Sequence, residues 1–213
     1  MKTVFKFRVL VAIMVIAATS CSKDDKESVT KLESGAFNGR ITASVENSSA
    51  ISGKIDYVLA SADLVLSGGS YNFTTLGFGE YKSGGFTIVL DTPESNKLRG
   101  IEDLFQNVFK VSGTLKYTNP SARATFVLDF LSVYEDNGDI YGGGLFRNRT
   151  PDETTMCVFV YVDEDVNVTA SKNISVSLKE GWNRMFYSSG SDKSEVTTKN
   201  PGSTKWYYSG GES

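Results

Sequence analysis

Apolar and polar residues alternate along most of the chain after residue 36. Ile41, Ala43 and Val45 alternate with polar neighbours, and residues 109–117 and 174–178 repeat the pattern. Such alternation predicts antiparallel strands with one face toward a core and the other toward water. Further strands are predicted near residues 54–60, 62–67, 70–78, 85–91, 122–134, 139–147, 184–188 and 204–209.

Turn-forming residues separate these segments, among them Gly68-Gly69, Gly84-Gly85, Asn137-Gly138 and Gly190. About ten or eleven short strands with few helical windows predict an all-β fold. The expected architecture is an antiparallel β-sandwich or a closed β-barrel, a class that includes the lipocalin or calycin type. Strand order and closure of the sheet stay open at this level.

Two segments are apolar on both faces, residues 156–162 and residues 126–133, the latter interrupted by Asp129. Strands of this kind are expected to lie centrally, covered on both sides. One short helix is predicted near residues 93–106, where Thr92 can cap it and Pro93 suits its first position. This helix is the expected cover.

The first twenty residues predict a processing signal. Lys2, Lys6 and Arg8 precede an apolar run at residues 9–18. A membrane-spanning helix needs about 20 residues, so this run is too short to form one. Small residues then lead directly to Cys21. This end resembles the lipobox of bacterial lipoproteins, although Ala18 stands where that pattern usually has Leu. The resemblance implies a leader over residues 1–20 and lipidation of Cys21; the alternative is an ordinary signal peptide followed by a chance cysteine.

Residues 22–27 (SKDDKE) contain no apolar residue and predict a flexible acidic tether over residues 21–35, ahead of a single β domain over residues 36–213. The segment resembles the acidic export signal of Bacteroidetes-type surface lipoproteins. That resemblance implies an outer-membrane protein that faces outward, held to the membrane by its N-terminal lipid.

The charge balance excludes one class of partner. Three of the 22 basic residues lie in the leader and none of the 25 acidic ones does, so the chain from Cys21 onward has 19 basic and 25 acidic residues, a net charge of −6. Nucleic-acid binding depends on grouped Lys and Arg, and no such group is present. We therefore expect no nucleic-acid partner.

Several phrases carry a wider resemblance. They are residues 41–47 (ITASVEN), 54–56 (KID), 79–88 (GEYKSGGFTI), 161–166 (YVDEDV), 178–183 (LKEGWN) and 197–208 (TTKNPGSTKWYY). As a set they resemble a Bacteroidetes-type family of surface lipoproteins of uncharacterised activity, with a GWN turn and a C-terminal KWY motif. The resemblance implies a β architecture and carries no catalytic or binding residue with it.

The chain contains no histidine, which removes the commonest general base and the commonest transition-metal ligand. Cys157 lies in an apolar run and is expected to be a buried structural thiol. We therefore predict no catalytic residue, no metal and no cofactor.

Carboxylate pairs could serve glycoside hydrolysis, which needs two acids about 5 to 9.5 Å apart. The candidates are Glu135, Asp136, Asp139, Asp152, Glu153, Asp163, Glu164 and Asp165, with Asp129 inside an apolar strand. Most of them adjoin turn residues, where acids are ordinarily solvated. Residues 163–167 begin like a calcium loop, but Val168 stands where such a loop needs glycine.

Aromatic residues give the positive indication of binding. Trp206, Tyr207 and Tyr208 are the candidate ligand-binding residues, because exposed rings stack on sugars or anchor a protein partner. The alternative is a terminal strand that completes the core. The leading hypothesis is a non-enzymatic binding module for a glycan, a small apolar ligand or a protein; the alternatives are a carboxylate-based glycoside hydrolase and a structural or adhesive surface protein.

Overall fold

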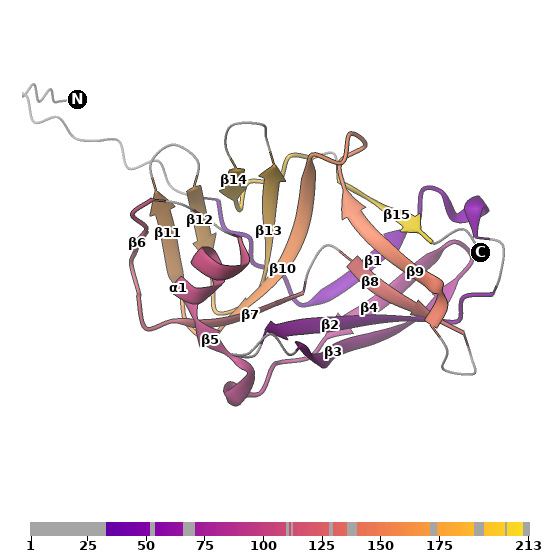
Figure 1. Cartoon of the computed structure of the whole chain (residues 1–213), viewed down its shortest axis with the longest axis horizontal. Coiled ribbons are helices and arrows are strands. Elements are labelled where there is room, and N and C mark those ends of the chain that lie inside the picture. The colour runs from indigo at the N-terminus through magenta and orange to yellow at the C-terminus, as the bar shows by residue number, and fades with distance from the viewer. Residues whose placement is uncertain are drawn as a thin grey trace, which may run out of the picture. The chain divides into compact units, whose positions relative to one another are not determined.

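The computed structural model describes residues 33–51, 54–65, 71–109, 111, 113–127, 130–135, 140–170, 174–189, 194–202 and 204–210, all within one structural unit, Leu32–Ser213 (Figure 1). The fold is all-β, as the alternation predicts. The strands are β1 (Arg40–Ser44), β2 (Tyr57–Val65), β3 (Tyr71–Lys82), β4 (Gly85–Leu90), β5 (Arg99–Gly100), β6 (Lys116–Tyr117), β7 (Arg123–Val127), β8 (Phe130–Tyr134), β9 (Ile140–Arg149), β10 (Thr155–Val162), β11 (Val166–Ala170), β12 (Ile174–Leu178), β13 (Gly181–Ser189), β14 (Ser194–Thr197) and β15 (Lys205–Ser209).

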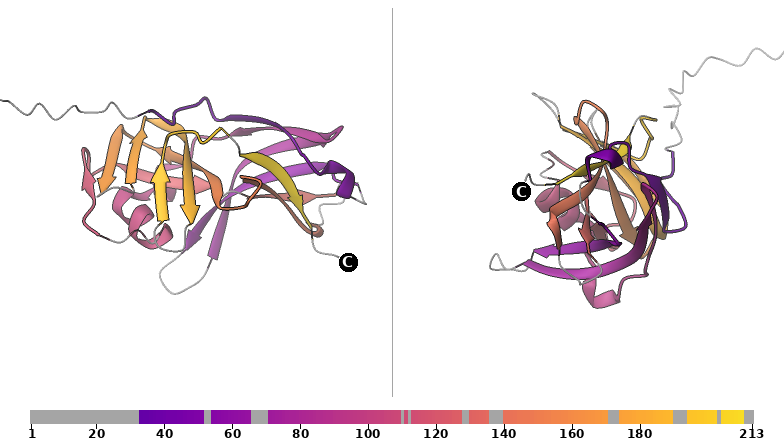
Figure 2. Two further views of the ribbon diagram at one scale, coloured as in Figure 1. Left: turned by 90° about the horizontal axis from the view of Figure 1, so that it is seen from above. Right: turned by 90° about the vertical axis from the view of Figure 1, so that its right-hand side faces the viewer.

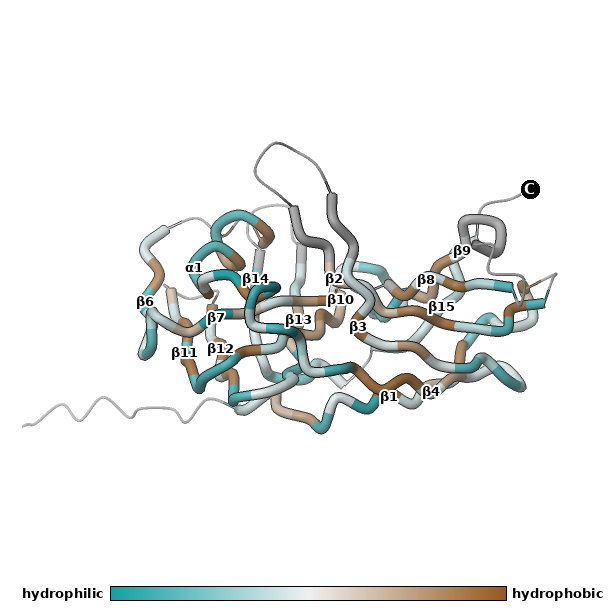
Figure 3. Tube along the Cα trace, turned by 90° about the horizontal axis from the view of Figure 1, so that it is seen from below, coloured by the Kyte–Doolittle hydropathy of each residue, from teal (hydrophilic) through white to brown (hydrophobic). Residues whose placement is uncertain are grey.

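Seven strands follow one another in the order β15, β9, β8, β2, β3, β4 and β1, and all of these neighbours pair antiparallel. Figure 1 labels these strands, and Figure 2 shows the same ribbon from two further sides. The row closes on itself at one point, where Val45 and Trp206 form a parallel bridge and the Glu46 N–H donates to the Trp206 carbonyl at 2.9 Å. Buried apolar residues alternate with more exposed residues along β1 and β4, and Figure 3 colours each residue by its hydropathy. The buried apolar residues belong to the first hydrophobic core.

Strand β10 separates this first core from a second one. Cys157, Phe159 and Tyr161 belong to the first core, and Met156, Val158, Val160 and Val162 belong to the second. Strands β7 and β13 pair with β10 on its two sides and divide their side chains in the same way. The prediction that residues 156–162 form a central strand covered on both faces is therefore confirmed.

A short helical segment covers the second core, but it begins later than the predicted residues 93–106. Helix α1 (Ile101–Asp103) continues into a π-helical turn, η3 (Leu104–Val108), and separate 3₁₀ turns lie at η1 (Ser48–Ala50) and η2 (Ser95–Lys97). Arg99 and Gly100 pair with β7 as a short strand, so the helix begins only at Ile101. No helix in the described part of the chain is long and apolar enough to cross a membrane.

The strand predicted over residues 109–117 is wrong for most of its length. Phe109 ends the helical segment, because its N–H donates to the Leu104 carbonyl at 3.2 Å. Among the described residues of this segment, only Lys116 and Tyr117 form a strand. The apolar positions Ile101, Leu104 and Phe105 lie on the helical face that Phe109 extends. The apparent alternation that begins at Phe109 therefore belongs in part to a helix.

Tyr117 carries a polar group in the second core that has no hydrogen-bond partner among the described residues. This group is the buried hydroxyl of its side chain. Burial, followed by the charge of Glu102, raises the pKa of Tyr117 to about 12. Between pH 10 and about 12 the unfolded state therefore loses this proton more readily than the folded state, and the free energy of unfolding falls as the pH rises.

We predict that Tyr117→Phe removes the contribution of Tyr117 to this pH dependence. At pH 7 the variant should be as stable as the wild type or more stable by up to about 1 kcal/mol, because no hydrogen bond is lost. Urea unfolding of the wild type and the variant at pH 7, 10 and 11 measures both effects. A loss of more than about 1 kcal/mol at pH 7 would contradict an unpartnered hydroxyl.

Candidate functional site

A cleft of about 350 Å³ lies between the outer edge of β1 and the strands β10, β13 and β15. We call it the β1–β15 cleft. Its lining is apolar at Ile41, Cys157, Phe159, Phe186 and Trp206, all of which are buried in the first core. These five side chains come from four strands that the fold brings together. Cys157 is 2% exposed, as its apolar surroundings predict.

Trp206 is the one member of the predicted Trp206–Tyr208 group that lines the cleft. Its ring stacks on Phe159, with centroids 6.2 Å apart and planes at 6°, and meets Phe86 edge-on at 5.1 Å. The side chain is only 6% exposed, so it also completes the core, as the alternative interpretation expects.

Tyr207 and Tyr208 lie away from the lining of the cleft. Tyr208 packs against the first core, with its ring 6.2 Å from that of Phe146. Tyr207 alternates with Trp206 along β15, so it points to the opposite face, where it pairs in register with Arg147. A role in binding stays a prediction for all three residues.

Polar side chains form the rim of the cleft. The Lys205 ammonium lies 3.0 Å from the Glu46 carboxylate, and this hydrogen bond raises the pKa of Lys205. The pair joins β15 to the residues just after β1. Arg184 on β13 is exposed, and its guanidinium lies 4.7 Å from the centre of the Phe37 ring. The cleft thus has an exposed cation on one wall and an ion pair on another.

Asn148 lines the cleft from β9, directly beside Trp206 in the register of the sheet. The residue is 8% exposed, and its Oδ1 has no hydrogen-bond partner among the described residues. An unpartnered buried acceptor costs about 1–3 kcal/mol. Asn148 is not predicted from the sequence, because the alternation of residues along a strand does not reveal which polar side chain points toward the core.

A second, shallower hollow of about 570 Å³ lies on the outer face of β1, β3 and β4. Hydroxyls of Thr42, Ser44 and Thr87 line it, with Glu80 and Lys82. Beside it the sheet exposes two apolar side chains, Phe78 at 55% and Val89 at 48%, which pair in register.

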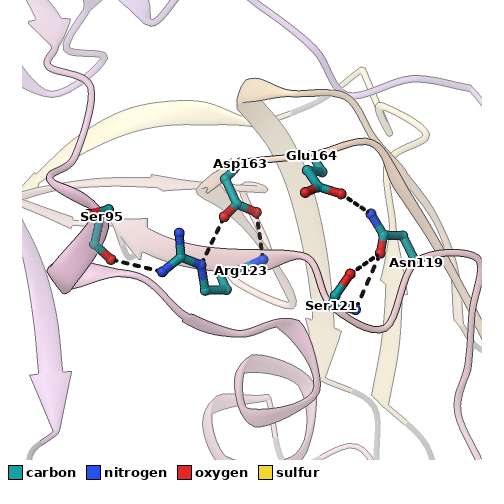
Figure 4. A network of polar contacts seen from close by, with 6 residues as sticks. All are labelled: Ser95, Asn119, Ser121, Arg123, Asp163 and Glu164. Carbon is teal, nitrogen blue, oxygen red and sulfur yellow. Dashed lines mark hydrogen bonds and ion pairs between the residues drawn. The ribbon is translucent and has the colours of Figure 1, made fainter.

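The acids predicted as calcium or catalytic candidates serve the structure individually. Asp163 accepts hydrogen bonds from the Arg123 N–H at 2.7 Å and from its Nε at 3.0 Å, while Glu164 accepts one from Asn119 at 2.6 Å (Figure 4). Asp165 accepts from Lys179 at 2.6 Å and from the Glu180 N–H at 2.9 Å, and these bonds lower its pKa. Each acid therefore fixes a different neighbour.

Two further described acids, Asp152 and Glu153, also have separate partners. Asp152 accepts hydrogen bonds from Thr150 and Thr154 within its own turn, which lower its pKa, and Glu153 lies 3.5 Å from Arg149. Within the described ranges, no three acidic or cysteine side chains converge as metal ligands would. Cys21, Asp129, Asp136 and Asp139 lie outside the described residues.

Comparison with known proteins adds no relative. The chain matches no family model, and neither the curated proteins nor the solved structures yield a similar protein.

We predict that Asn148→Leu raises the free energy of unfolding by about 1 kcal/mol, because a side chain of similar shape replaces a buried acceptor that has no partner. Chemical denaturation monitored by tryptophan fluorescence measures the change. Asn183→Leu is the matched control: its amide donates to the Lys179 and Gly181 carbonyls at 2.7 and 2.9 Å, so this substitution should destabilise. A destabilised Asn148→Leu protein would mean that the amide is satisfied.

Proposed function

We propose that this chain is an outer-membrane lipoprotein displayed at the cell surface, and that its β domain is a non-enzymatic binding module with the β1–β15 cleft as its ligand site. The leader, Cys21 and the acidic segment after it support the address. The cleft supports the activity. The ligand classes that fit a binding module of this kind are a glycan, a small apolar molecule and a protein segment.

The observation that carries the proposal is the combination of surfaces in the cleft. Its volume lies at the lower end of the about 300–1,000 Å³ of small-ligand sites, and it joins an apolar floor to a few polar groups, as such sites do. Among these polar groups, the Oδ1 of Asn148 is a buried acceptor without a hydrogen-bond partner in the described residues. A site that keeps such a stability cost gains from it when a ligand donor completes the hydrogen bond.

The alternative classes have less support in this cleft. A glycoside hydrolase needs two facing acids, whereas the acid that lines the cleft is Glu46, which is ion-paired with Lys205. A structural or adhesive role would use a flat face, and the exposed Phe78 and Val89 are its best candidates. The cleft favours binding over both.

The lipid anchor makes a direct prediction. In cells fed an alkyne-tagged fatty acid, the wild-type protein should take up the label and fractionate with the membrane, because the acyl chains are attached through Cys21. Cys21→Ala should lose the label and leave the membrane fraction. Cys157→Ala is the matched control and should keep both; label that survives Cys21→Ala would contradict the anchor.

The cleft makes a second prediction. Binding of the purified full chain to a glycan array, to a fluorescent fatty acid and to a phage-displayed library of random linear heptapeptides tests the three ligand classes in parallel. We expect saturable binding in at least one of them. Thr204→Trp, which places a large side chain on the half-buried wall of the cleft, should weaken it about tenfold or more.

The control for this substitution lies five residues further along the chain. Ser209→Trp adds the same side chain at an exposed position of β15 that does not line the cleft, so binding should persist. Binding in none of the three assays, or equal binding by both variants, would contradict the proposed function.

A further inference from the structure

The outer edge of β1 carries backbone groups that no described strand pairs with. Strand β1 is the last strand of the sheet on its side, next to β4. The Leu90 N–H donates to the Gly39 carbonyl and the Val45 N–H to the Gly84 carbonyl, both across to the β4 side. Backbone groups alternate in direction along a strand, so those of Thr42 and Ser44 point the other way.

These outward-pointing backbone groups of Thr42 and Ser44 border the β1–β15 cleft. Thr42 and Ser44 both line it, and just beyond them the Glu46 N–H already donates to the Trp206 carbonyl. At the other end, just before β1, the Phe37 N–H donates to the Trp182 carbonyl of β13 at 3.0 Å. The protein's own chain thus pairs beyond both ends of β1 and leaves the edge open only over the length of β1 itself. An unpaired edge of this kind is a template for another extended chain.

We propose that the ligand of the cleft is an extended polypeptide segment that adds to β1 as an antiparallel strand. This inference rests on the proposed binding function and names its ligand class. The added strand would exchange N–H and C=O groups with Thr42 and Ser44, and affinity would come chiefly from these main-chain hydrogen bonds. It would end at Trp206, where β15 takes over the pairing.

The side chains along β1 leave room for such a segment. Inward-facing Ile41 and Val45 are large and buried, whereas Ala43 between them is small and half-buried. A residue of the added strand opposite Ala43 would point inward, toward the apolar floor at Phe159 and Phe186. The preferred segment therefore carries an apolar residue there and alternates with polar residues on either side.

The charge of the cleft favours an acidic residue in the ligand. Arg184 lies over Phe37, three residues before β1, so its guanidinium marks the N-terminal end of that strand. An antiparallel partner brings its own C-terminal end to the same place. A carboxylate at that end would pair with the exposed guanidinium.

The walls of the cleft favour a single chain segment over a second copy of the domain. Besides β1, the cleft is lined by Asn200, Thr204 and Lys205, so other parts of the chain bound the space beside the edge. One strand needs about 4.8 Å beside its neighbour, whereas an intact sheet edge of another copy would bring its further strands against this wall.

The test uses the full chain in detergent and the best heptapeptide selected from the random linear library. Thr42→Pro removes one outward N–H while the β1–β4 hydrogen bonds, made by Gly39 and Val45 on either side, stay intact; proline is tolerated at such edge positions. We expect the Kd to rise about tenfold or more. The control is Thr87→Val on β4, which does not line the cleft: it removes the hydroxyl bonded to Thr42, keeps every N–H of β1 and should bind as the wild type does.

Chemical modification of the peptide provides a second readout that does not depend on the variant folding. N-methylation at successive peptide positions should abolish binding at every second residue, with tolerated positions between, because only alternate N–H groups face β1. In hydrogen exchange, the amides of Thr42 and Ser44 should become protected when the peptide binds, whereas the Val45 amide is protected already. Arg184→Gln should weaken binding most at low salt.

The outcomes separate this inference from the function on which it rests. If glycans or the fatty acid bind and respond to Thr204→Trp while Thr42→Pro has no effect, the cleft is a binding site and strand addition is wrong. A uniform N-methylation profile would also overturn it. If sedimentation shows self-association that Thr42→Pro abolishes, the edge joins two copies and the peptide assignment is wrong. Failure of all three ligand classes overturns both proposals.

Discussion

The structure depends on one strand that is apolar on both faces. Because side chains of β10 alternate between two cores, Val158 and Phe159 are both almost fully buried although they point in opposite directions. Burial of such side chains contributes about 1.5–3 kcal/mol each. The pairing of β10 with β7 and β13 fixes which residues of those strands enter which core. A shift of one residue in this register would exchange the contents of the two cores.

Much of this arrangement can be predicted from the sequence. The two-sided apolar character of residues 156–162 predicts their central place, and the alternation of β1 and β4 predicts their single buried face. The sequence pattern misleads where a helical and a strand periodicity overlap. Phe109 fits an alternating segment, yet its N–H donates to the Leu104 carbonyl of a helical turn. The prediction omits β11, because its alternating Val166 and Val168 directly follow three acids that suggest a solvated loop.

The cleft could not be predicted in the same way. Its lining comes from segments more than 150 residues apart, since Ile41 and Trp206 both contribute to it. Their proximity is a property of strand order, and alternation says nothing about which strands are neighbours. The motif of residues 205–208 directs attention to the right strand, but only the register of β15 against β9 places Asn148 beside Trp206.

The closing bridge between Val45 and Trp206 joins a strand near the start of the domain to its last strand. Contacts between such distant segments form late, because loop closure opposes them until the intervening chain is ordered. The ring of strands can therefore not be completed until residues near the C-terminus have emerged from synthesis. A chain that threads through a translocation channel from its N-terminus would remain open, and so remain transportable, for nearly its whole length.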